Sequence, residues 1–236
     1  MSSSDETPAA VARALQSALR QSDTELCNGA WPTAGWRLAV ESGVTGWTIP
    51  TVFAGSGCSA TAVLDGCIEL ARGSLSMTFI LSQFHAAVAR VLDSENDSLK
   101  RQWLPALANG HVFATVGISH LTTSRQHARQ AVMSAVPRGV GYELTGETPW
   151  ITGADQADLL VVGAVTPTGE QLLFGVQTKS AGLTVRPPYP LVALGESRTA
   201  AVAFDRVSVG PEDWLAGPAP QVLQSKSRTG AGSLTT

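Results

Sequence analysis

A short segment between two predicted strands carries the residue types best suited to chemistry. It runs Gly146-Glu147-Thr148-Pro149-Trp150-Ile151-Thr152-Gly153-Ala154-Asp155-Gln156-Ala157-Asp158. Trp150 offers a flat apolar face, and Thr152 offers a hydroxyl that both donates and accepts hydrogen bonds. A planar aromatic ligand needs such a wall and such an edge contact. The alternative is a core tryptophan in an ordinary turn, because buried aromatic residues are common.

A glycine-rich run offers a second kind of chemistry. Gly55-Ser56-Gly57-Cys58-Ser59-Ala60 follows an apolar segment and opens a predicted helix, whose N–H groups could hold a pyrophosphate. A dinucleotide fold also needs a second parallel strand and an acidic residue about 20 positions further on. Here the chain continues as a helix from Ser74 to Leu92, and Leu75 is apolar. The sequence therefore does not favour a dinucleotide site.

Other catalytic patterns are missing from the sequence. It contains no Gly-x-Ser-x-Gly elbow for a hydrolase nucleophile. The histidines lack zinc-protease spacing and the cysteines form no close pair; they are His85, His111, His120, His127, Cys27, Cys58 and Cys67. The unpaired cysteines fit a reduced compartment better than a disulfide framework. We expect no metal site and assign no catalytic residue within this chain.

Composition narrows the class of protein. The chain has 236 residues, of which 44% are hydrophobic, so it can bury a proper core. Its formal net charge of -3 provides no basic surface, and nucleic acid is not an expected partner. The start of the chain lacks the features of a secretory signal, and the apolar region from Met77 to Leu92 falls short of the ~20 residues of a membrane span. We expect a cytoplasmic protein that does not enter a membrane.

The elements that must position the Trp150 segment change character along the chain. Apolar residues at three- and four-residue steps predict helices in the first part. These are expected at 8–26, after Pro32, at 60–73, at 74–92, and from a Ser98 cap to Asn109-Gly110.

Beyond Gly110 the pattern becomes that of strands, because β-branched and apolar runs alternate with glycine and proline. The expected strands are His111 to Ser119, Ala131 to Val136, Gly141 to Thr145, Leu159 to Val165, Gln171 to Gln177 and Thr199 to Val207. We predict an α+β protein with an all-helical domain at 1–110, an antiparallel β-barrel domain at 111–217, and at 218–236 a flexible tail or the start of a further helical domain.

Four segments in this order resemble the acyl-CoA dehydrogenase family, from about Gly43 to Gly217. The first is Ile49-Pro50 with Phe53-Ala54-Gly55-Ser56-Gly57, and the second is Trp103-Leu104-Pro105-Ala106-Leu107-Ala108-Asn109-Gly110. The third is Gly146 to Asp158, and the fourth is Phe204-Asp205-Arg206-Val207-Ser208-Val209. Each is weak alone, but four in family order are fairly specific. The resemblance implies a flavoprotein that oxidises an acyl-CoA thioester with FAD and assembles as a homo-oligomer when complete.

The resemblance also implies cofactor contacts. Trp150 and Thr152 match the family's Trp-Ile-Thr signature at the flavin ring, and Ile118 and Ser119 match a strand end that meets the flavin. Ser124 matches the serine of the family's Thr-Glu-Pro...Gly-Ser-Asp stretch.

The same stretch departs from the family pattern. His120 replaces the acid, Arg125 replaces the aspartate, and Thr148 stands where the family usually has lysine. The alternatives are therefore a noncatalytic ligand-binding or interaction module on the same scaffold, or a flavin monooxygenase relative.

The base that removes the substrate's α proton is expected outside this chain. In the family that glutamate lies in a C-terminal helical domain, which the resemblance places beyond Thr236. The chain is expected to be a fragment or a naturally truncated product, and inactive on its own.

Overall fold

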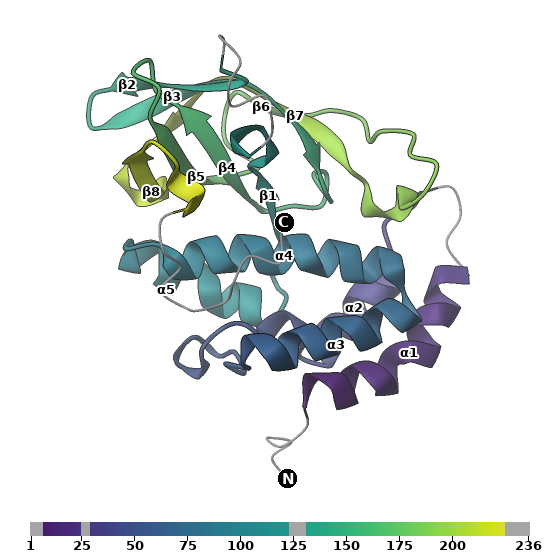
Figure 1. Cartoon of the computed structure of the whole chain (residues 1–236). Coiled ribbons are helices and arrows are strands. Elements are labelled where there is room, and N and C mark those ends of the chain that lie inside the picture. Colours follow the sequence, from purple (N-terminus) through teal and green to yellow (C-terminus); the bar gives the residue numbers. More distant parts are fainter. Residues whose placement is uncertain (1–6, 25–28, 123–130, 225–236) are drawn as a thin grey trace.

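A computed structural model describes residues 7–24, 29–122 and 131–224. Within them, five α-helices precede eight strands (Figure 1). The helices are α1 (Pro8–Thr24), α2 (Thr33–Glu41), α3 (Ala60–Gly73), α4 (Leu75–Asp93) and α5 (Asp97–Ala108). The strands are β1 (Ala114–Gly117), β2 (Met133–Arg138), β3 (Gly141–Ile151), β4 (Leu159–Val165), β5 (Gln171–Gln177), β6 (Leu183–Val185), β7 (Ala200–Val209) and β8 (Trp214–Ala219). The predicted order of a helical part followed by a β-sheet part is confirmed.

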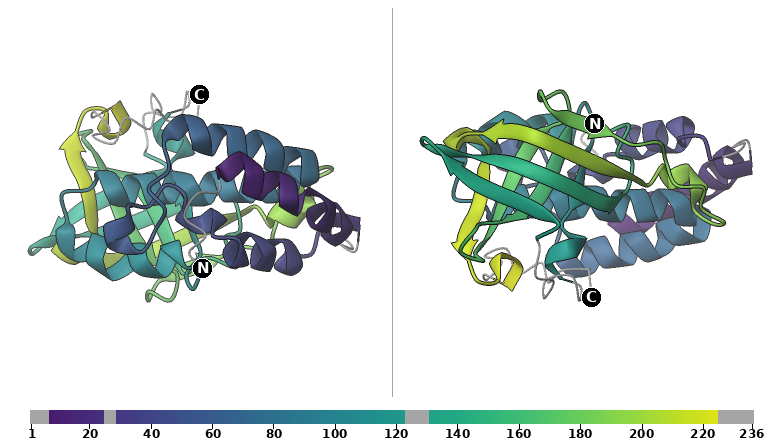
Figure 2. Two further views of the ribbon diagram at one scale, coloured as in Figure 1. Left: turned by 90° about the horizontal axis from the view of Figure 1, so that it is seen from below. Right: turned by 90° about the horizontal axis from the view of Figure 1, so that it is seen from above.

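The helices and the curved sheet form two halves of the molecule, and α4 lies at the junction between them (Figures 1 and 2). One face of α4 is fully buried and includes Met77, Ile80, Phe84 and Val88. Among the described helices, α4 alone has the length and apolar composition that a membrane span would need. Its packing against α3, α5 and β1 accounts for that composition.

Side-chain caps define where α3, α4 and α5 begin. The Ser74 hydroxyl accepts a hydrogen bond from the Met77 N–H at 3.1 Å and starts α4. For α5, the Asn96 side chain accepts from the Leu99 N–H at 3.1 Å. The expectation that Ser98 caps α5 is therefore wrong, because Asn96 performs this role two residues earlier.

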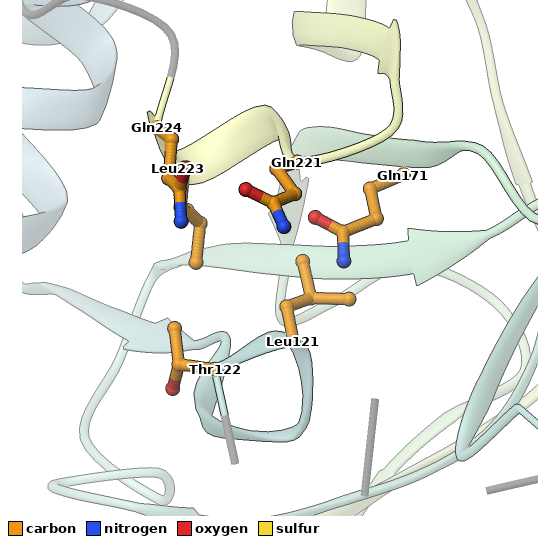
Figure 3. A pocket seen from close by; sticks show the side chains of 6 residues that line it. All are labelled: Leu121, Thr122, Gln171, Gln221, Leu223 and Gln224. Carbon is orange, nitrogen blue, oxygen red and sulfur yellow. The ribbon is translucent and has the colours of Figure 1, made fainter. Parts of the chain in front are cut away.

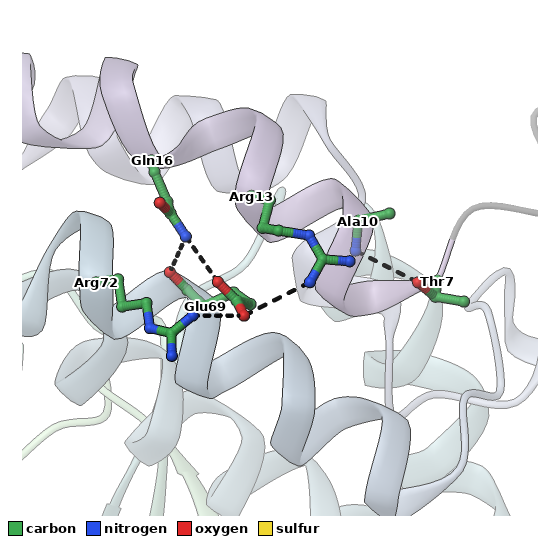
Figure 4. Close-up of polar contacts among 6 residues, drawn as sticks. All are labelled: Thr7, Ala10, Arg13, Gln16, Glu69 and Arg72. Carbon is green, nitrogen blue, oxygen red and sulfur yellow. Dashed lines mark hydrogen bonds and ion pairs between the residues drawn. The ribbon is translucent and has the colours of Figure 1, made fainter.

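A buried carboxylate holds α1 against α3. Glu69 accepts a hydrogen bond from the Gln16 side chain at 2.8 Å and another from Arg72 at 2.9 Å, and it lies 3.5 Å from Arg13 (Figure 4). Its side chain is only 12% exposed. Three polar partners surround it, so the charge can be buried without a large desolvation cost.

The sheet is mixed, which corrects the expectation of a purely antiparallel barrel. Its order is β6-β7-β3-β2-β4-β5-β8, and β1 pairs with β4 outside that path. The β1–β4 pairing is parallel, as is a short contact between β2 and β4 at Ser134 and Val165. The other strand pairs are antiparallel.

Two hydrogen bonds between Phe113 and Asp158 explain why β1 and β4 pair in parallel. The Phe113 N–H donates to the Asp158 carboxylate at 3.1 Å, and the Asp158 N–H donates to the Phe113 carbonyl at 2.9 Å. These residues immediately precede β1 and β4, so both strands leave the same point in the same direction.

Several strand boundaries differ from the predicted ones. The expected strand from His111 to Ser119 shortens to β1, because the N–H groups of His111 and Val112 still bond to Ala106 at the end of α5. Conversely, β3 extends beyond Thr145 to Ile151. The short edge strands β6 and β8 were not predicted, since β8 contains Gly217-Pro218, which reads as a turn.

The helical and sheet halves share aromatic packing. Phe113, just before β1, lies 5.2 Å from both Trp31 and Trp36 and 6.1 Å from Phe84, between ring centroids. The boundary at Gly110 between two folding domains stays a prediction. For the proposed tail, residues 225–236 lie outside the described part of the chain.

Candidate functional site

Trp150 occupies an unusual position at the end of β3. Its φ is 62°, in the left-handed region that large side chains rarely adopt, and the β3–β7 register shifts between Thr148 and Ile151. The resulting bulge leaves the Trp150 side chain 57% exposed. Its ring centroid lies 4.7 Å from that of Tyr189, with 46° between the ring planes. Backbone strain and an exposed aromatic at one residue are typical of a functional position.

Thr152 lies two residues further on and is buried, with 2% of its surface exposed. Its hydroxyl is 3.4 Å from the Thr199 hydroxyl, which is 2.8 Å from the Ser197 hydroxyl. The main chain joins the same two segments, because the Gly153 N–H donates to the Ser197 carbonyl at 2.7 Å. Trp150 is thus exposed, whereas Thr152, two residues further on, is covered.

Gly153 lets the Trp150 segment pack closely against the helical half. Its φ is 62°, and a Cβ there would lie 2.6 Å from Phe113 and 3.0 Å from Trp31. Only glycine fits both the backbone conformation and the space. The site is therefore fixed to the aromatic packing between the two halves.

Charged groups also anchor the loop that precedes β7. Arg198 bonds to the Asp155 carboxylate through two nitrogens, one of them at 2.8 Å, and this hydrogen bonding raises the pKa of Arg198. A third nitrogen donates to the Gly29 carbonyl at 3.4 Å. Close by in the sequence, Glu196 accepts a hydrogen bond from Ser76 on α4 at 3.1 Å. The loop is thus tied to both halves of the molecule.

The end of β1 lies against the Trp150 segment. A Cβ on Gly117 would lie 2.8 Å from Ile151 and 3.2 Å from the Thr148 hydroxyl. Ile118 and Ser119 follow directly and are half-buried. The recorded hydrogen bonds and ring contacts do not link them to Trp150 or Thr152. Ser124 lies outside the described residues.

Two buried hydroxyls near this point have no hydrogen-bond partner in the described part of the chain. They belong to Thr115 on β1 and Thr148 on β3. His120, which follows the end of β1, is also buried and lies 2.9 Å from the Gly163 carbonyl through its Nε2. Of the three positions where the sequence departs from the family pattern, His120 and Thr148 are thus buried, and Arg125 lies outside the described residues.

A separate hollow opens on another side of the sheet. Its lining is Leu121, Thr122, Gln171, Gln221, Leu223 and Gln224 (Figure 3). The side-chain amide oxygen of Gln171 (Oε1) already accepts a hydrogen bond from the Val222 N–H at 3.1 Å. None of the six side chains is titratable, so this hollow offers no acid, base or nucleophile.

Sequence reasoning missed the residues that support Trp150 and Thr152. Tyr189 stands between prolines in the β6–β7 connection, and Ser197 and Thr199 come later in that connection. The one sequence signal for Tyr189 is that it is an aromatic residue in a run rich in proline and leucine. No spacing rule links these residues to β3, because the register shift sets the contacts.

Residues 5–111 match the family model for the acyl-CoA dehydrogenase N-terminal domain. This match assigns residues 5–111 to the acyl-CoA dehydrogenase N-terminal domain family. It is 25% identical over 198 residues to the probable acyl-CoA dehydrogenase YngJ of Bacillus subtilis, covering 80% of this chain and 51% of YngJ. The chain thus spans about half the length of that relative.

Two solved structures with a bound flavin share the fold. A glutaryl-CoA dehydrogenase from Mycobacterium smegmatis, in complex with FADH2, has a TM-score of 0.77 and 22% identity, covering 90% of this chain and 55% of its own. FMN-bound TdsC from Paenibacillus sp. A11-2 has a TM-score of 0.76 and 23% identity, covering 89% and 54%. At these identities the likeness concerns the fold alone.

Proposed function

We propose that this chain forms the flavin-binding part of an FAD-dependent acyl-CoA dehydrogenase. The observation that carries the proposal is the exposed indole of Trp150, held by a strained bulge and set two residues before a buried hydroxyl. A flavin needs a flat apolar surface and a hydrogen-bonding group at its edge, and this segment supplies both. FAD, rather than FMN, is inferred from family membership.

The residues of this chain would hold and orient the ring. Trp150 would lie against one face of the flavin, and Thr152 would meet the ring edge. Ile118 and Ser119, at the end of β1, would approach from the neighbouring strand, and we extend the proposal to Ser124. When bound, the flavin would accept a hydride from the acyl thioester. Gly153 and the aromatic packing beneath it would exclude water from the inner side of the site.

The acids beside Trp150 are poorly placed to remove a substrate proton. Glu147 bonds to Arg186 at 2.9 Å, and Asp155 bonds to Arg198. Asp158 accepts from the Phe113 N–H. All three carboxylates have structural partners. We propose that the general base is supplied from outside this chain, and that the complete protein is a cytoplasmic homo-oligomer of fatty acid metabolism.

Flavin titration of the purified chain tests the proposal. Wild-type protein is expected to bind FAD, with a shift of the visible absorption bands. A Trp150→Ala, Thr152→Ala double variant is expected to bind at least about tenfold more weakly, because stacking and an edge hydrogen bond are both lost. Trp103→Ala on α5, a half-buried tryptophan away from the segment, is the matched control. Equal binding by wild type and the double variant would refute the proposed site.

A noncatalytic module is the second candidate. It is favoured by the buried Thr148 hydroxyl, which has no hydrogen-bond partner in the described residues at a position where the family usually has lysine. A chain that stays colourless with both FAD and FMN would support this candidate. Binding of FMN in preference to FAD would instead favour a flavin monooxygenase relative.

A further inference from the structure

Three buried hydroxyls form a short chain behind Trp150. Ser197 Oγ lies 2.8 Å from Thr199 Oγ1, which lies 3.4 Å from Thr152 Oγ1. Ser197 is fully buried, Thr199 is 5% exposed and Thr152 is 2% exposed. Neighbouring groups, rather than bulk water, therefore set the direction of each O–H bond.

Main-chain hydrogen bonds hold the three residues in register. The Gly153 N–H donates to the Ser197 carbonyl at 2.7 Å, and the Tyr189 N–H donates to the Thr199 carbonyl at 2.9 Å. The loop that supplies the ring beside Trp150 thus also supplies the hydroxyls beside Thr152. The β6–β7 connection therefore supports both Trp150 and Thr152.

Counting hydrogens shows what the chain can do. Each hydroxyl carries one hydrogen, and the two contacts between the three oxygens use two of the three. In the described part of the protein, no other hydrogen-bonding group is recorded for these hydroxyls. One hydrogen is thus left over at one end of the chain. An acceptor placed beyond Thr152 would direct every O–H toward it, from Ser197 through Thr199 to Thr152.

We propose that Ser197 and Thr199 are positioning residues that orient the Thr152 hydroxyl toward the flavin ring. This inference rests on the proposed function. In the oxidised ring the edge nitrogen accepts a hydrogen bond, and in the reduced ring the same nitrogen carries a hydrogen and donates. Since no fixed donor or acceptor among the described residues ends the chain at Ser197, its direction can reverse between the two states. The same three hydroxyls then serve both forms of the cofactor.

The competing explanation is that these hydroxyls only satisfy one another inside the fold. In that case, removing the Thr199 hydroxyl would change stability without changing the bound flavin. The two explanations therefore differ in the cofactor's affinity and spectrum.

The test compares Thr199→Val, Ser197→Ala, Thr152→Val and Thr199→Ser by FAD titration and visible absorption spectroscopy. Thr199→Val is expected to weaken FAD binding about three- to tenfold and to shift the flavin bands toward those of Thr152→Val. Ser197→Ala should change both in the same direction by less. Thr199→Ser should restore the wild-type values. Thr178→Val is the matched control, because its hydroxyl donates to the Ala157 carbonyl at 2.6 Å, outside the chain of hydroxyls.

The outcomes separate this inference from the proposed function. Wild-type binding of FAD with Thr199→Val and Ser197→Ala indistinguishable from the Thr178→Val control overturns the inference alone. Failure of wild type to bind either FAD or FMN overturns both. If Thr199→Val does not fold, Ser197→Ala decides the matter, since the inference predicts weaker FAD binding and a spectral shift in this variant and a purely structural role predicts neither.

Discussion

The rings of Trp150 and Tyr189 are in contact, tilted by 46° at a centroid separation of 4.7 Å, although the bulge in β3 and the β6–β7 connection are far apart in sequence. The contact stabilises an indole that the backbone places in the left-handed region. The half-buried Tyr189 ring thereby lies against an exposed indole at the end of β3. The arrangement has a free-energy cost that a purely structural tryptophan would not require.

Replacing Trp150 should separate stability from ligand binding. Asparagine tolerates the left-handed region better than tryptophan, so Trp150→Asn is expected to leave the free energy of unfolding unchanged or to raise it by up to about 1 kcal/mol. The same variant should lose FAD binding. Urea unfolding and flavin titration measure the two effects. Trp36→Ala, in the aromatic packing between the halves, should instead lower stability by about 3 kcal/mol. A comparable loss for Trp150→Asn would show that Trp150 is a core residue.

The buried histidine of α4 should make stability depend on pH. Burial lowers the pKa of His85 to about 4, from an ordinary value of 6.5, and its Nδ1 lies 3.2 Å from the Thr48 hydroxyl. Between these two pH values the unfolded chain binds a proton that the folded chain does not. The free energy of unfolding is therefore unaffected by His85 protonation above pH 6.5. Below that value it falls by about 1.4 kcal/mol per pH unit as the pH approaches 4.

Urea unfolding of wild type and His85→Met between pH 4 and pH 7 measures this dependence. The difference between the two proteins isolates His85 from Asp23 and Asp213, whose pKa values are raised by burial. His111→Gln, at an exposed position, is the control. Parallel pH curves for wild type and His85→Met would contradict the prediction.

The carboxylate of Glu69 should matter more than surface ion pairs. Glu69→Ala leaves Gln16 and Arg72 without their shared partner between α1 and α3, so we expect a loss of about 1 to 3 kcal/mol in the free energy of unfolding. Glu41→Ala removes an exposed pair with Arg37 at 3.9 Å and should change stability by less than about 0.5 kcal/mol. Thermal unfolding monitored by circular dichroism compares them. Equal losses of stability for Glu69→Ala and Glu41→Ala would contradict the prediction, because they would mean that the burial of Glu69 adds nothing to stability.

The chain alone should not dehydrogenate an acyl-CoA at an appreciable rate, even with FAD bound. A general base typically contributes about 10²- to 10⁴-fold, and the acids near Trp150 already have partners. A dye-reduction assay with several acyl-CoA thioesters tests this. Turnover that disappears in Glu147→Gln or Asp155→Asn would identify a base within the chain.

The helices could be predicted from the sequence because the spacing of apolar residues indicates which helix face is buried, as on α4. Their caps were less readable: Asn96 and Ser98 both suit an N-cap, and only tertiary contacts select Asn96, whose amide also donates to the Pro211 carbonyl. The parallel pairing of β1 with β4 depends on the Phe113–Asp158 tie, and no local pattern encodes it. Trp150 and Thr152 emerged from a contiguous motif, whereas Tyr189, Ser197 and Thr199 reach them only through folding.

The double anchoring of the β6–β7 connection makes the hydroxyls sensitive to events in the helical half. Ser76 on α4 holds Glu196, and the Gly29 carbonyl holds Arg198, on either side of Ser197. A displacement of α4 along its axis would pull on this connection and change the separation between Thr199 and Thr152. Helix α4 is thus connected to the site through Glu196, and we expect substitutions at Ser76, which leave Trp150 untouched, to change the hydrogen bond that Thr152 offers to its ligand.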